Sequence, residues 1–335
     1  MHGSTRGHAG TRRRIAGAVG VLGMLAALTA CSGSDEPSDD GSAMSEDGGT
    51  TAVTVGVIPI VDVAPIYLGV DQGFFTDQGL DVTLETAQGG AAIVPAVVSG
   101  QYQFGFSNST SLLLATSSDL ALQAVTAGVA TTGEEGADFG GVVVPADSDI
   151  ESVADLAGKT VAVNTLNNIN TTTINQAVRD AGGDPSTITY TELGFPDIVP
   201  AVAQGDVDAG QVVEPFLSAA EAQDMRQIVS NYAAADPDLT ISMYFTSDQF
   251  AQEDPDTVEQ FTAAMNESLE YADAHPDEVR EILGTYTDMD AATLDALTLP
   301  RWPTEIDTDS IQLLADLAVT DGVLDEAPDL DALLP

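Results

Sequence analysis

Residues 164–173 are the part of the chain whose side chains best suit ligand binding. Eight of these ten residues are Asn or Thr, and they lie between an apolar run expected to be a buried strand and a helical pattern. Short uncharged side chains beside the free N–H groups of a helix N-terminus can bind sulfonate, carboxylate or ring nitrogen atoms. We predict Asn168, Asn170, Thr171 and Thr172 as ligand-binding residues. The alternative is a polar surface loop in which Asn170 is an ordinary N-cap.

Three other turns are expected to lie at the same edge, because each follows a strand or begins a helix. Asp62 lies in the turn 60–64, Gly89 and Gly90 open a helix, and Asn108 and Ser109 follow an apolar run. Amide and hydroxyl groups at such positions can contact a ligand, and they can equally cap the next helix. All five are candidate site residues.

Two later turns add an aromatic ring and two carboxylates. Phe195 is expected to form an aromatic wall, and Asp197 to be the N-cap of the next helix. If Glu214 points inward, it favours a ligand with an amine or amidine, because burying an unpaired carboxylate is costly. If Glu214 caps the helix that begins at Pro215, it says nothing about the ligand. No basic residue falls in any of these turns, which favours a zwitterionic, neutral or cationic solute.

The sequence lacks the residue sets that catalytic and metal centres need. His275 is the only histidine after residue 8 and Cys31 is the only cysteine, so zinc sites and His-dependent triads lack parts. Gly158-Lys159-Thr160 resembles the end of a phosphate-binding loop, but Val153 stands where the loop needs glycine. We therefore predict no metal, no cofactor and no catalytic residue.

From residue 53 onward, apolar runs rich in β-branched residues alternate with helical patterns. This alternation predicts an α/β fold with parallel sheets flanked by helices. The alternation occurs in two blocks, and from about residue 254 the pattern is helical, most clearly over residues 258–274.

The two blocks contain an internal repeat. The sequence IVPAV at residues 93–97 recurs at residues 198–202, and Gly100 and Gly105 recur as Gly205 and Gly210, all at an offset of 105. We interpret each copy as a helix with proline in its first turn, then a glycine stop and a buried strand. Each helix N-terminus would then point at the carboxyl edge of its sheet, where open α/β sheets bind ligands.

The N-terminus has the pattern of an export signal that ends at Cys31. Four arginines precede an apolar run at residues 15–28, which is shorter than the roughly 20 residues that a membrane span needs. Leu28-Thr29-Ala30-Cys31 resembles the lipobox of bacterial lipoproteins, which implies a signal peptide at residues 1–30 and lipidation of Cys31. An uncleaved anchor helix and plain secretion are the alternatives. Residues 31–51 are acidic and poor in apolar side chains, so we predict a disordered tether.

The charge of the chain excludes some partners. It has 9 basic and 53 acidic residues, a net charge of −44, and without the four N-terminal arginines the charge is −48. Such a surface repels phosphate backbones and anionic headgroups, so we predict no nucleic-acid binding and a membrane contact through the lipid anchor alone.

Several motifs together resemble solute-binding lipoproteins of ABC importers, of the nitrate, sulfonate, taurine and thiamine-pyrimidine-precursor type. The motifs are APIYLG at 64–69, GFF at 73–75, GLDV at 79–82, GG at 89–90, VADLAGKTVAV at 153–163, GDVDA at 205–209 and EPF at 214–216. The resemblance implies a periplasmic-binding-protein fold of the second type, with two Rossmann-like lobes joined by a hinge of two crossovers. The crossovers would lie near residues 144–146 and 242–244, so lobe one would contain 52–144 plus 245–335, and lobe two 145–244.

The resemblance also implies a function. A monomer outside the cytoplasm, lipid-anchored to the outer face of the cell membrane, would capture a small organic solute between the lobes and deliver it to a permease and an ATPase. The solute would be sulfonate-, taurine- or nitrate-like, or aminopyrimidine-like. Two other functions stay open: a pyrimidine-synthase-like enzyme, which would need a reactive His and Cys set, and an extracellular sensor domain.

Overall fold

The computed structural model describes residues 49–334. The predicted signal peptide, Cys31 and nearly all of the predicted tether lie outside the described residues. Within residues 49–334, no helix has the length and apolar character that a membrane crossing requires.

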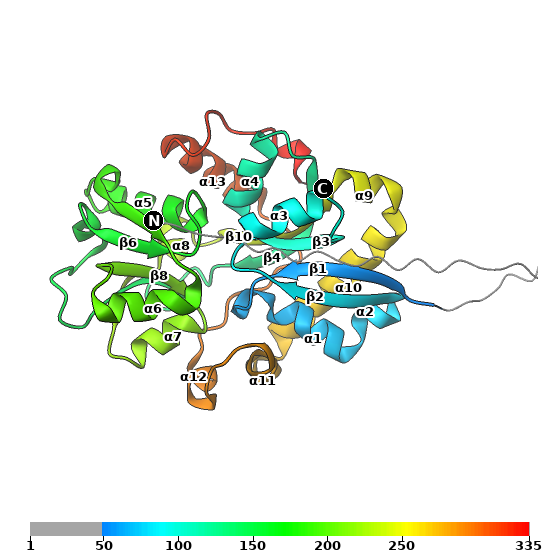
Figure 1. Cartoon of the computed structure of the whole chain (residues 1–335), viewed down its shortest axis with the longest axis horizontal. Coiled ribbons are helices and arrows are strands. Elements are labelled where there is room, and N and C mark those ends of the chain that lie inside the picture. Colours follow the sequence, from blue (N-terminus) through cyan, green and yellow to red (C-terminus); the bar gives the residue numbers. More distant parts are fainter. Residues whose placement is uncertain (1–48, 335) are drawn as a thin grey trace, which may run out of the picture. The chain divides into compact units, whose positions relative to one another are not determined.

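The first sheet has five strands in the order β2-β1-β3-β10-β4 (Figure 1). Strand β1 (Thr51–Val57) pairs in parallel with β2 (Leu80–Thr86) and β3 (Phe104–Asn108). Strand β10 (Thr240–Ser247) is antiparallel to β3 and to β4 (Leu122–Ala130). The helices between these strands are α1 (Ala64–Gln72), α2 (Phe74–Asp77), α3 (Gly90–Val98) and α4 (Ser109–Ser117). We call this sheet and its helices lobe one.

The second sheet repeats this arrangement, with the order β7-β6-β8-β5-β9. Strand β6 (Thr160–Val163) pairs in parallel with β7 (Thr189–Glu192) and β8 (Ala209–Val213). Strand β5 (Gly140–Val144) is antiparallel to β8 and to β9 (Arg226–Val229). The helices are α5 (Ile169–Asp180), α6 (Phe195–Gln204), α7 (Phe216–Glu221) and α8 (Asn231–Ala235). This second sheet and its helices form lobe two.

The strands after the two crossings correct the predicted boundaries. The antiparallel strands β5 and β10 are the first strands after the chain crosses between the sheets, so neither sheet is wholly parallel as expected. The crossings therefore lie in residues 131–139 and 236–239, not near 144–146 and 242–244. The predicted bounds of lobe one (52–144 plus 245–335) and lobe two (145–244) shift with the crossings, because β5 belongs to lobe two and β10 to lobe one. A buried β-branched run looks the same in either sheet, so the sequence pattern could not assign β5 and β10.

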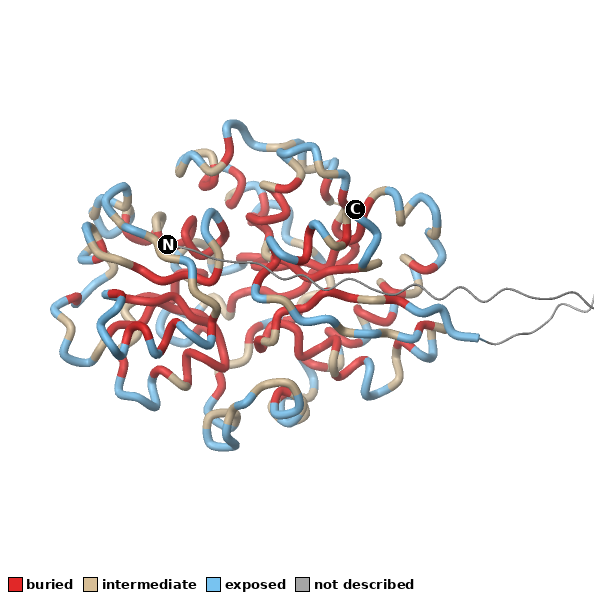
Figure 2. The backbone as a smooth tube through the Cα atoms, in the orientation of Figure 1, coloured by how far each residue is buried: buried red, intermediate tan, exposed pale blue. Residues whose placement is uncertain are grey.

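The C-terminal helices cover lobe one and reach lobe two. They are α9 (Asp248–Glu253), α10 (Pro255–Ala274), α11 (Pro276–Tyr286), α12 (Ala291–Ala296) and α13 (Thr308–Thr320). Phe261 of α10 stacks on Phe104 of β3, with ring centroids 3.8 Å apart, and the central strands of both sheets are buried along their length (Figure 2). Helix α13 packs against α4 of lobe one and α5 of lobe two. An ion pair of 2.6 Å between Arg179 and Asp321 joins the same regions.

The repeat corresponds to two equivalent contacts of a helix with a strand. A Cβ atom added to Gly105 of β3 would lie 2.5 Å from Cγ2 of Ile93 in α3, and one added to Gly210 of β8 would meet Ile198 of α6 in the same way. Only glycine therefore allows these isoleucines to lie directly on the strands. Close packing in both lobes fixes where the N-termini of α3 and α6 lie.

The helix starts in the repeat differ in part from those expected. Gly89 is the N-cap of α3, as predicted. Pro95 and Pro200 lie inside their helices rather than in the first turn, and Gly194 rather than Asp197 is the N-cap of α6. In α6 it is Pro196, four residues before Pro200, that occupies the first turn, the position expected for Pro200.

We predict that Gly105→Ala lowers the free energy of unfolding by about 1–3 kcal/mol, because the new methyl group overpacks Ile93. Ile93→Ala should also destabilise the protein, but the double variant should lose less than the sum, because each change relieves the other. Urea unfolding of the three variants measures this coupling. Strictly additive losses would show that the contact between helix and strand does not constrain Gly105.

Candidate ligand-binding site

A cavity of about 30 Å³ lies between the two lobes, and we call it the interlobe cavity. Its walls come from the ends of β1, β3, β6 and β8, from β10, and from the starts of α5, α6 and α8. The lining residues are Ile58, Ile60, Asp62, Phe106, Asn108, Ile241 and Ser242 of lobe one, and Asn164, Asn168, Ile169, Asn170, Phe195, Val213 and Tyr232 of lobe two. The cavity therefore lies where the sequence places the ligand edge of both sheets.

Three asparagines at the start of α5 form one buried hydrogen-bond network. Asn164 Oδ1 accepts hydrogen bonds from Nδ2 of Asn168, at 3.0 Å, and from Nδ2 of Asn170, at 2.9 Å. Asn168 is the N-cap of α5, and its Oδ1 accepts from the backbone N–H groups of Asn170 and Thr171. Asn170 Oδ1 accepts from the hydroxyl of Tyr232 at 2.5 Å. The network orders the lobe-two wall of the cavity.

Two backbone N–H groups join the lobes beside the cavity. Asn108 caps α4 by accepting from Ser111 N at 2.9 Å, and the same Oδ1 lies 3.4 Å from the N–H of Ile169, the first residue of α5. On another side, the N–H of Val61 donates to the backbone oxygen of Glu214 at 3.0 Å. The lobes are therefore in contact around the cavity.

Asp62 is the buried acid of the cavity. It lies in the 3₁₀ helix η1 (Val61–Val63), is 4% exposed, and its Oδ1 has no hydrogen-bond partner among the described residues. Burial, with a smaller effect from the charge of Asp138, raises the pKa of Asp62 from 3.8 to about 7. Asp138, in the first crossing, instead accepts bonds from Thr131 and from three backbone N–H groups.

Aromatic hydroxyls surround Asp62 and stay protonated. Burial and the charge of Asp62 both raise the pKa of Tyr232 and of Tyr244 well above 10.0. Tyr244 packs against Phe106, with ring centroids 5.2 Å apart, and neither its hydroxyl nor that of Ser242 has a partner within residues 49–334. The region around Asp62 therefore combines aromatic rings with free hydroxyl oxygens.

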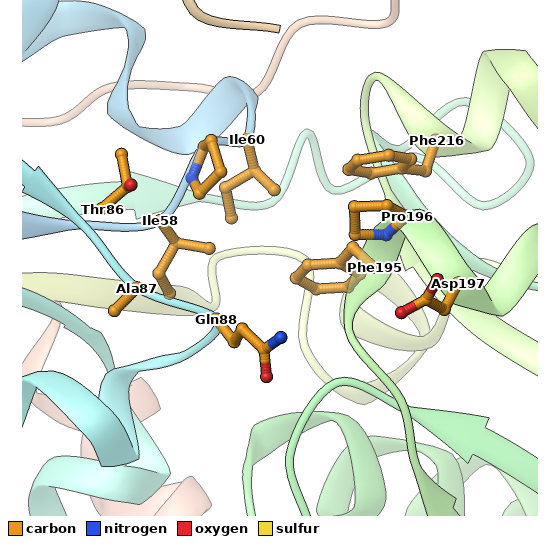
Figure 3. A pocket seen from close by; sticks show the side chains of 10 residues that line it. Ile58, Ile60, Thr86, Ala87, Gln88, Phe195, Pro196, Asp197 and Phe216 are labelled. Atoms are coloured by element: carbon orange, nitrogen blue, oxygen red, sulfur yellow. The ribbon is translucent and has the colours of Figure 1, made fainter. Parts of the chain in front are cut away.

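A larger pocket of about 260 Å³, the outer pocket, shares Ile58, Ile60 and Phe195 with the interlobe cavity. Figure 3 shows lobe-one side chains on one side, including Gln88, and Phe195, Pro196, Asp197 and Phe216 of lobe two on the other. The rings of Phe195 and Phe216 are stacked with centroids 6.0 Å apart. This pocket can accept a flat or apolar group.

The structure brings some of the predicted residues together. Asp62, Asn108, Asn168, Asn170 and Phe195 line the interlobe cavity, and Phe195 and Asp197 line the outer pocket.

The other predicted residues line neither space and support the helix ends around them. Ser109 donates to the backbone oxygens of Thr240 and Ile241, at 2.9 and 3.1 Å. The hydroxyls of Thr171 and Thr172 donate to the backbone oxygen of Asn168. Gly89 and Gly90 begin α3, where an added Cβ on Gly90 would collide with Ser107.

Glu214 acts as a helix cap in this structure. Its carboxylate accepts from the N–H of Ser218 at 2.9 Å, from the hydroxyl of Ser218 at 2.7 Å and from the N–H of Thr298 at 3.1 Å. Of the two orientations considered from the sequence, the structure has the capping one. Thr298 lies in the C-terminal region, so Glu214 also joins lobe two to the segment after α12.

Sequence reasoning missed Tyr232, Ser242, Phe106 and Ile58 as cavity residues. Tyr232 lies in α8, a helix of five residues that the sequence pattern did not reveal. Ser242 lies in β10, which was interpreted as a crossover. The alternation of Thr240, Ser242 and Thr246 with apolar residues was a signal for a strand with one polar face.

Within the described part of the chain, no group of three or more His, Cys, Asp or Glu side chains could hold a metal ion. His275, the histidine in this part, bonds the backbone oxygen of Tyr271 at 2.8 Å and stacks on its ring, and it does not line the cavity.

The arrangement of two linked α/β lobes is the periplasmic-binding-protein fold. The alkanesulfonate-binding protein SsuA from Xanthomonas axonopodis pv. citri, bound to MOPS, superposes with a TM-score of 0.73 over 86% of this chain and 99% of that chain. Its sequence is 19% identical, so the likeness concerns the fold. The predicted fold class is confirmed.

Residues 60–279 match the family model described as NMT1/THI5 like, and the chain belongs to this family. The formylaminopyrimidine-binding protein of Halalkalibacterium halodurans is 24% identical over 67% of this chain and 66% of its own length. A Brachyspira hyodysenteriae protein described as an ABC transporter periplasmic binding protein is 26% identical over 84% of this chain and 86% of its own length. The 4-amino-5-hydroxymethyl-2-methylpyrimidine phosphate synthase of Aspergillus parasiticus is 24% identical over 64% of each chain. The chain thus spans about two thirds of the length of the first and third relatives.

We predict that Glu214→Gln changes how stability depends on pH. Burial raises the pKa of Glu214 from 4.5 to about 7 despite its three hydrogen bonds. Between these pH values the unfolded chain releases the proton while the folded chain retains it, so the wild type loses stability as pH rises, by up to about 3 kcal/mol. The Gln variant cannot titrate and should lack this loss.

Urea unfolding at pH 4.5, 6 and 8 tests the prediction, with Glu259→Gln on exposed α10 surface as the control. Any stability lost because Gln replaces one carboxylate oxygen acceptor should lower the free energy of unfolding by the same amount at all three pH values. Parallel stability profiles for wild type and Glu214→Gln would contradict a raised pKa.

Proposed function

We propose that this protein is the solute-binding component of an ABC importer, working outside the cytoplasm. The observation that carries the proposal is a cavity walled by both lobes in which Asp62 Oδ1 and Ser242 Oγ are buried with no partner in the described part of the chain. Buried polar atoms in native proteins nearly always have partners, so these atoms fit a ligand that is bound between the lobes. The family and the names of the binding-protein relatives support the same function.

Capture would proceed by closure of the lobes about the two crossings. Residues 131–139 and 236–239 are the connections that would act as the hinge, because each joins a strand of one sheet to the other lobe. A ligand that contacts Asp62 on one side and the Asn170–Tyr232 pair on the other adds bonds between the lobes. Its binding energy therefore favours the closed arrangement.

We infer that the protein binds its solute without transforming it. The relative named as a pyrimidine phosphate synthase makes an enzyme the second candidate. The interlobe cavity offers one carboxylate, amides and hydroxyls, and His275 lies elsewhere. A sensor domain on the same fold would share the ligand site but not the importer.

We propose further that Cys31 is acylated and holds a monomer at the outer face of the membrane, in reach of a permease and an ATPase. The proposal depends on the apolar run before Cys31 and on the acidic segment after it, both outside the described residues. An anchor raises the local concentration of a binding protein at its importer. One acyl chain binds membranes only marginally, so the diacylated cysteine of the lipobox pattern would be needed.

We expect the purified full chain to carry one small molecule per monomer. Native mass spectrometry before and after denaturation should give a mass difference that matches one organic solute, and small-angle scattering should show a smaller radius once that solute is added back. Asn170→Ala removes the acceptor of the Tyr232 hydroxyl and should weaken binding about tenfold, whereas Asn167→Gly, outside the cavity lining, should not. Turnover of the solute into a product would overturn the proposal in favour of an enzyme.

We expect Cys31→Ala to abolish acylation and to move the full chain from the membrane fraction to the soluble fraction of an expressing bacterium. Mass analysis of the N-terminal peptide of the wild type should give a mature chain that begins at an acylated Cys31. Thr29→Ser, which keeps a small residue before the cysteine, is the control. A wild-type chain that retains residues 1–30 would instead indicate an uncleaved anchor.

A further inference from the structure

Within residues 49–334, the carboxylate of Asp62 has no positively charged partner. Its Oδ1 has no hydrogen-bond partner among these residues, and Asp62 is 4% exposed. Buried carboxylates in proteins are normally paired with a cation or bonded to several donors, because desolvation of an unpaired charge is costly. Asp138 shows the second solution in the same region, with five donors on its two oxygens.

No cation of the described chain can pair with Asp62, because every basic side chain in residues 49–334 is engaged elsewhere. Lys159 pairs with Asp149, Arg179 with Asp321 and Arg301 with Asp238; Arg226 and Arg280 bond backbone oxygens, as does His275. None of these six residues lines the cavity. The missing positive charge must come from outside these residues.

The donors at the start of α5, where an anion would bind, are already used. At the N-terminus of α5, the N–H groups of Asn170 and Thr171 donate to Asn168 Oδ1, and that of Ile169 donates to Asn108 Oδ1. The amide nitrogens of Asn168 and Asn170 donate to Asn164. Side chains of the protein therefore neutralise the helix end that would otherwise hold an anion. Among the residues that line the cavity, Asp62 Oδ1 and Ser242 Oγ are buried without partners in residues 49–334, and the unpartnered hydroxyl of Tyr244 lies nearby.

The two spaces differ in size, so they suit different parts of one ligand. The interlobe cavity of about 30 Å³ admits only a compact group, and the outer pocket of about 260 Å³ begins behind the shared wall of Ile58, Ile60 and Phe195. Phe106 lines the cavity beside Asp62 and packs on Tyr244, so an aromatic face lies near the carboxylate. Such a face also attracts cations.

We propose that the ligand carries a compact, positively charged nitrogen group with N–H donors, an ammonium or amidinium, which pairs with Asp62 in the interlobe cavity while the rest of the molecule occupies the outer pocket. This inference rests on the proposed function and names the class of solute. The cation donates to Asp62 Oδ1 and Ser242 Oγ and completes the two unpartnered acceptors.

The pH dependence of binding follows from the same pairing. Burial raises the pKa of ligand-free Asp62 to about 7, and the titratable groups that act on it or feel its charge are Asp138 and the phenols of Tyr232, Tyr244 and Tyr286. A cation pairs only with the ionised carboxylate, so its affinity should fall about tenfold for each pH unit below about 7. A neutral ligand that accepts a bond from protonated Asp62 would show the opposite slope.

Guanidinium, urea and nitrate provide a matched set of probes, because all three are small, planar and trigonal and their charges are +1, 0 and −1. Titration calorimetry of the full chain, unfolded and refolded to remove bound solute, should give at pH 8 an affinity for guanidinium at least tenfold above that for urea or nitrate. The guanidinium affinity should weaken from pH 8 to pH 5, with most of the change below pH 7.

Asp62→Asn should weaken guanidinium binding at least 30-fold and remove the preference over urea. Asp81→Asn, an exposed carboxylate on β2 of the same lobe, should change neither. Ser242→Ala keeps the carboxylate and removes the second acceptor, so it should weaken binding several-fold even if Asp62→Asn does not refold.

Equal or tighter binding of urea or nitrate, binding of none of the three, or unchanged guanidinium affinity in Asp62→Asn and Ser242→Ala would each overturn the cation assignment. The solute-binding function would survive any of these results if a neutral or anionic solute still copurified with the chain. A chain that carries no solute and responds to none would fail both proposals.

Discussion

The two crossings of the chain between its sheets determine where every candidate binding group lies. The first strand after each crossing, β5 or β10, lies antiparallel between two strands that run parallel to each other. With this arrangement, the carboxyl ends of β1, β3, β6 and β8 all face the space between the lobes. Asn108 ends β3, and Asp62, Asn164 and Glu214 lie just after β1, β6 and β8. A site assembled in this way needs residues from distant parts of the sequence, and it changes whenever the lobes move.

Within each lobe, close packing of helix on strand gives that site its precision. Ile93 on Gly105 and Ile198 on Gly210 hold α3 and α6 against the sheets so closely that a Cβ atom on either glycine would overlap the isoleucine side chain. The asparagine network then orders the start of α5 without any charged group. In a chain with so many carboxylates, neutral amides at this position avoid adding further repulsion to a space that already contains Asp62 and lies near Asp138.

Much of this architecture could be predicted from the sequence, because buried strands such as Thr160–Val163 are short runs rich in β-branched residues that alternate with helical patterns. The repeat and the Asn- and Thr-rich stretch likewise identified two of the helix starts that surround the cavity. Sheet membership of β5 and β10 could not be predicted, since it depends on which partner strand a buried run meets in three dimensions. The role of Glu214 was undecided for a similar reason: its second partner, Thr298, is 84 residues away in the sequence.

Helix α13 has a consequence for the conformational equilibrium of the two lobes. It follows the lobe-one elements in sequence, yet it packs on α5, and Arg179 pairs there with Asp321, whose side chain is 5% exposed. Rotation of the lobes about the crossings must break this contact or carry α13 along. The relative position of the lobes is therefore held both by the crossings and by the contact between α13 and α5. Ionic strength acts on the contact between α13 and α5 through this ion pair, and only weakly, because the side chain of Asp321 is buried. Outside the cytoplasm, where the proposed function places the protein, a change in salt concentration would therefore reach the equilibrium of the lobes through a contact other than the ligand cavity.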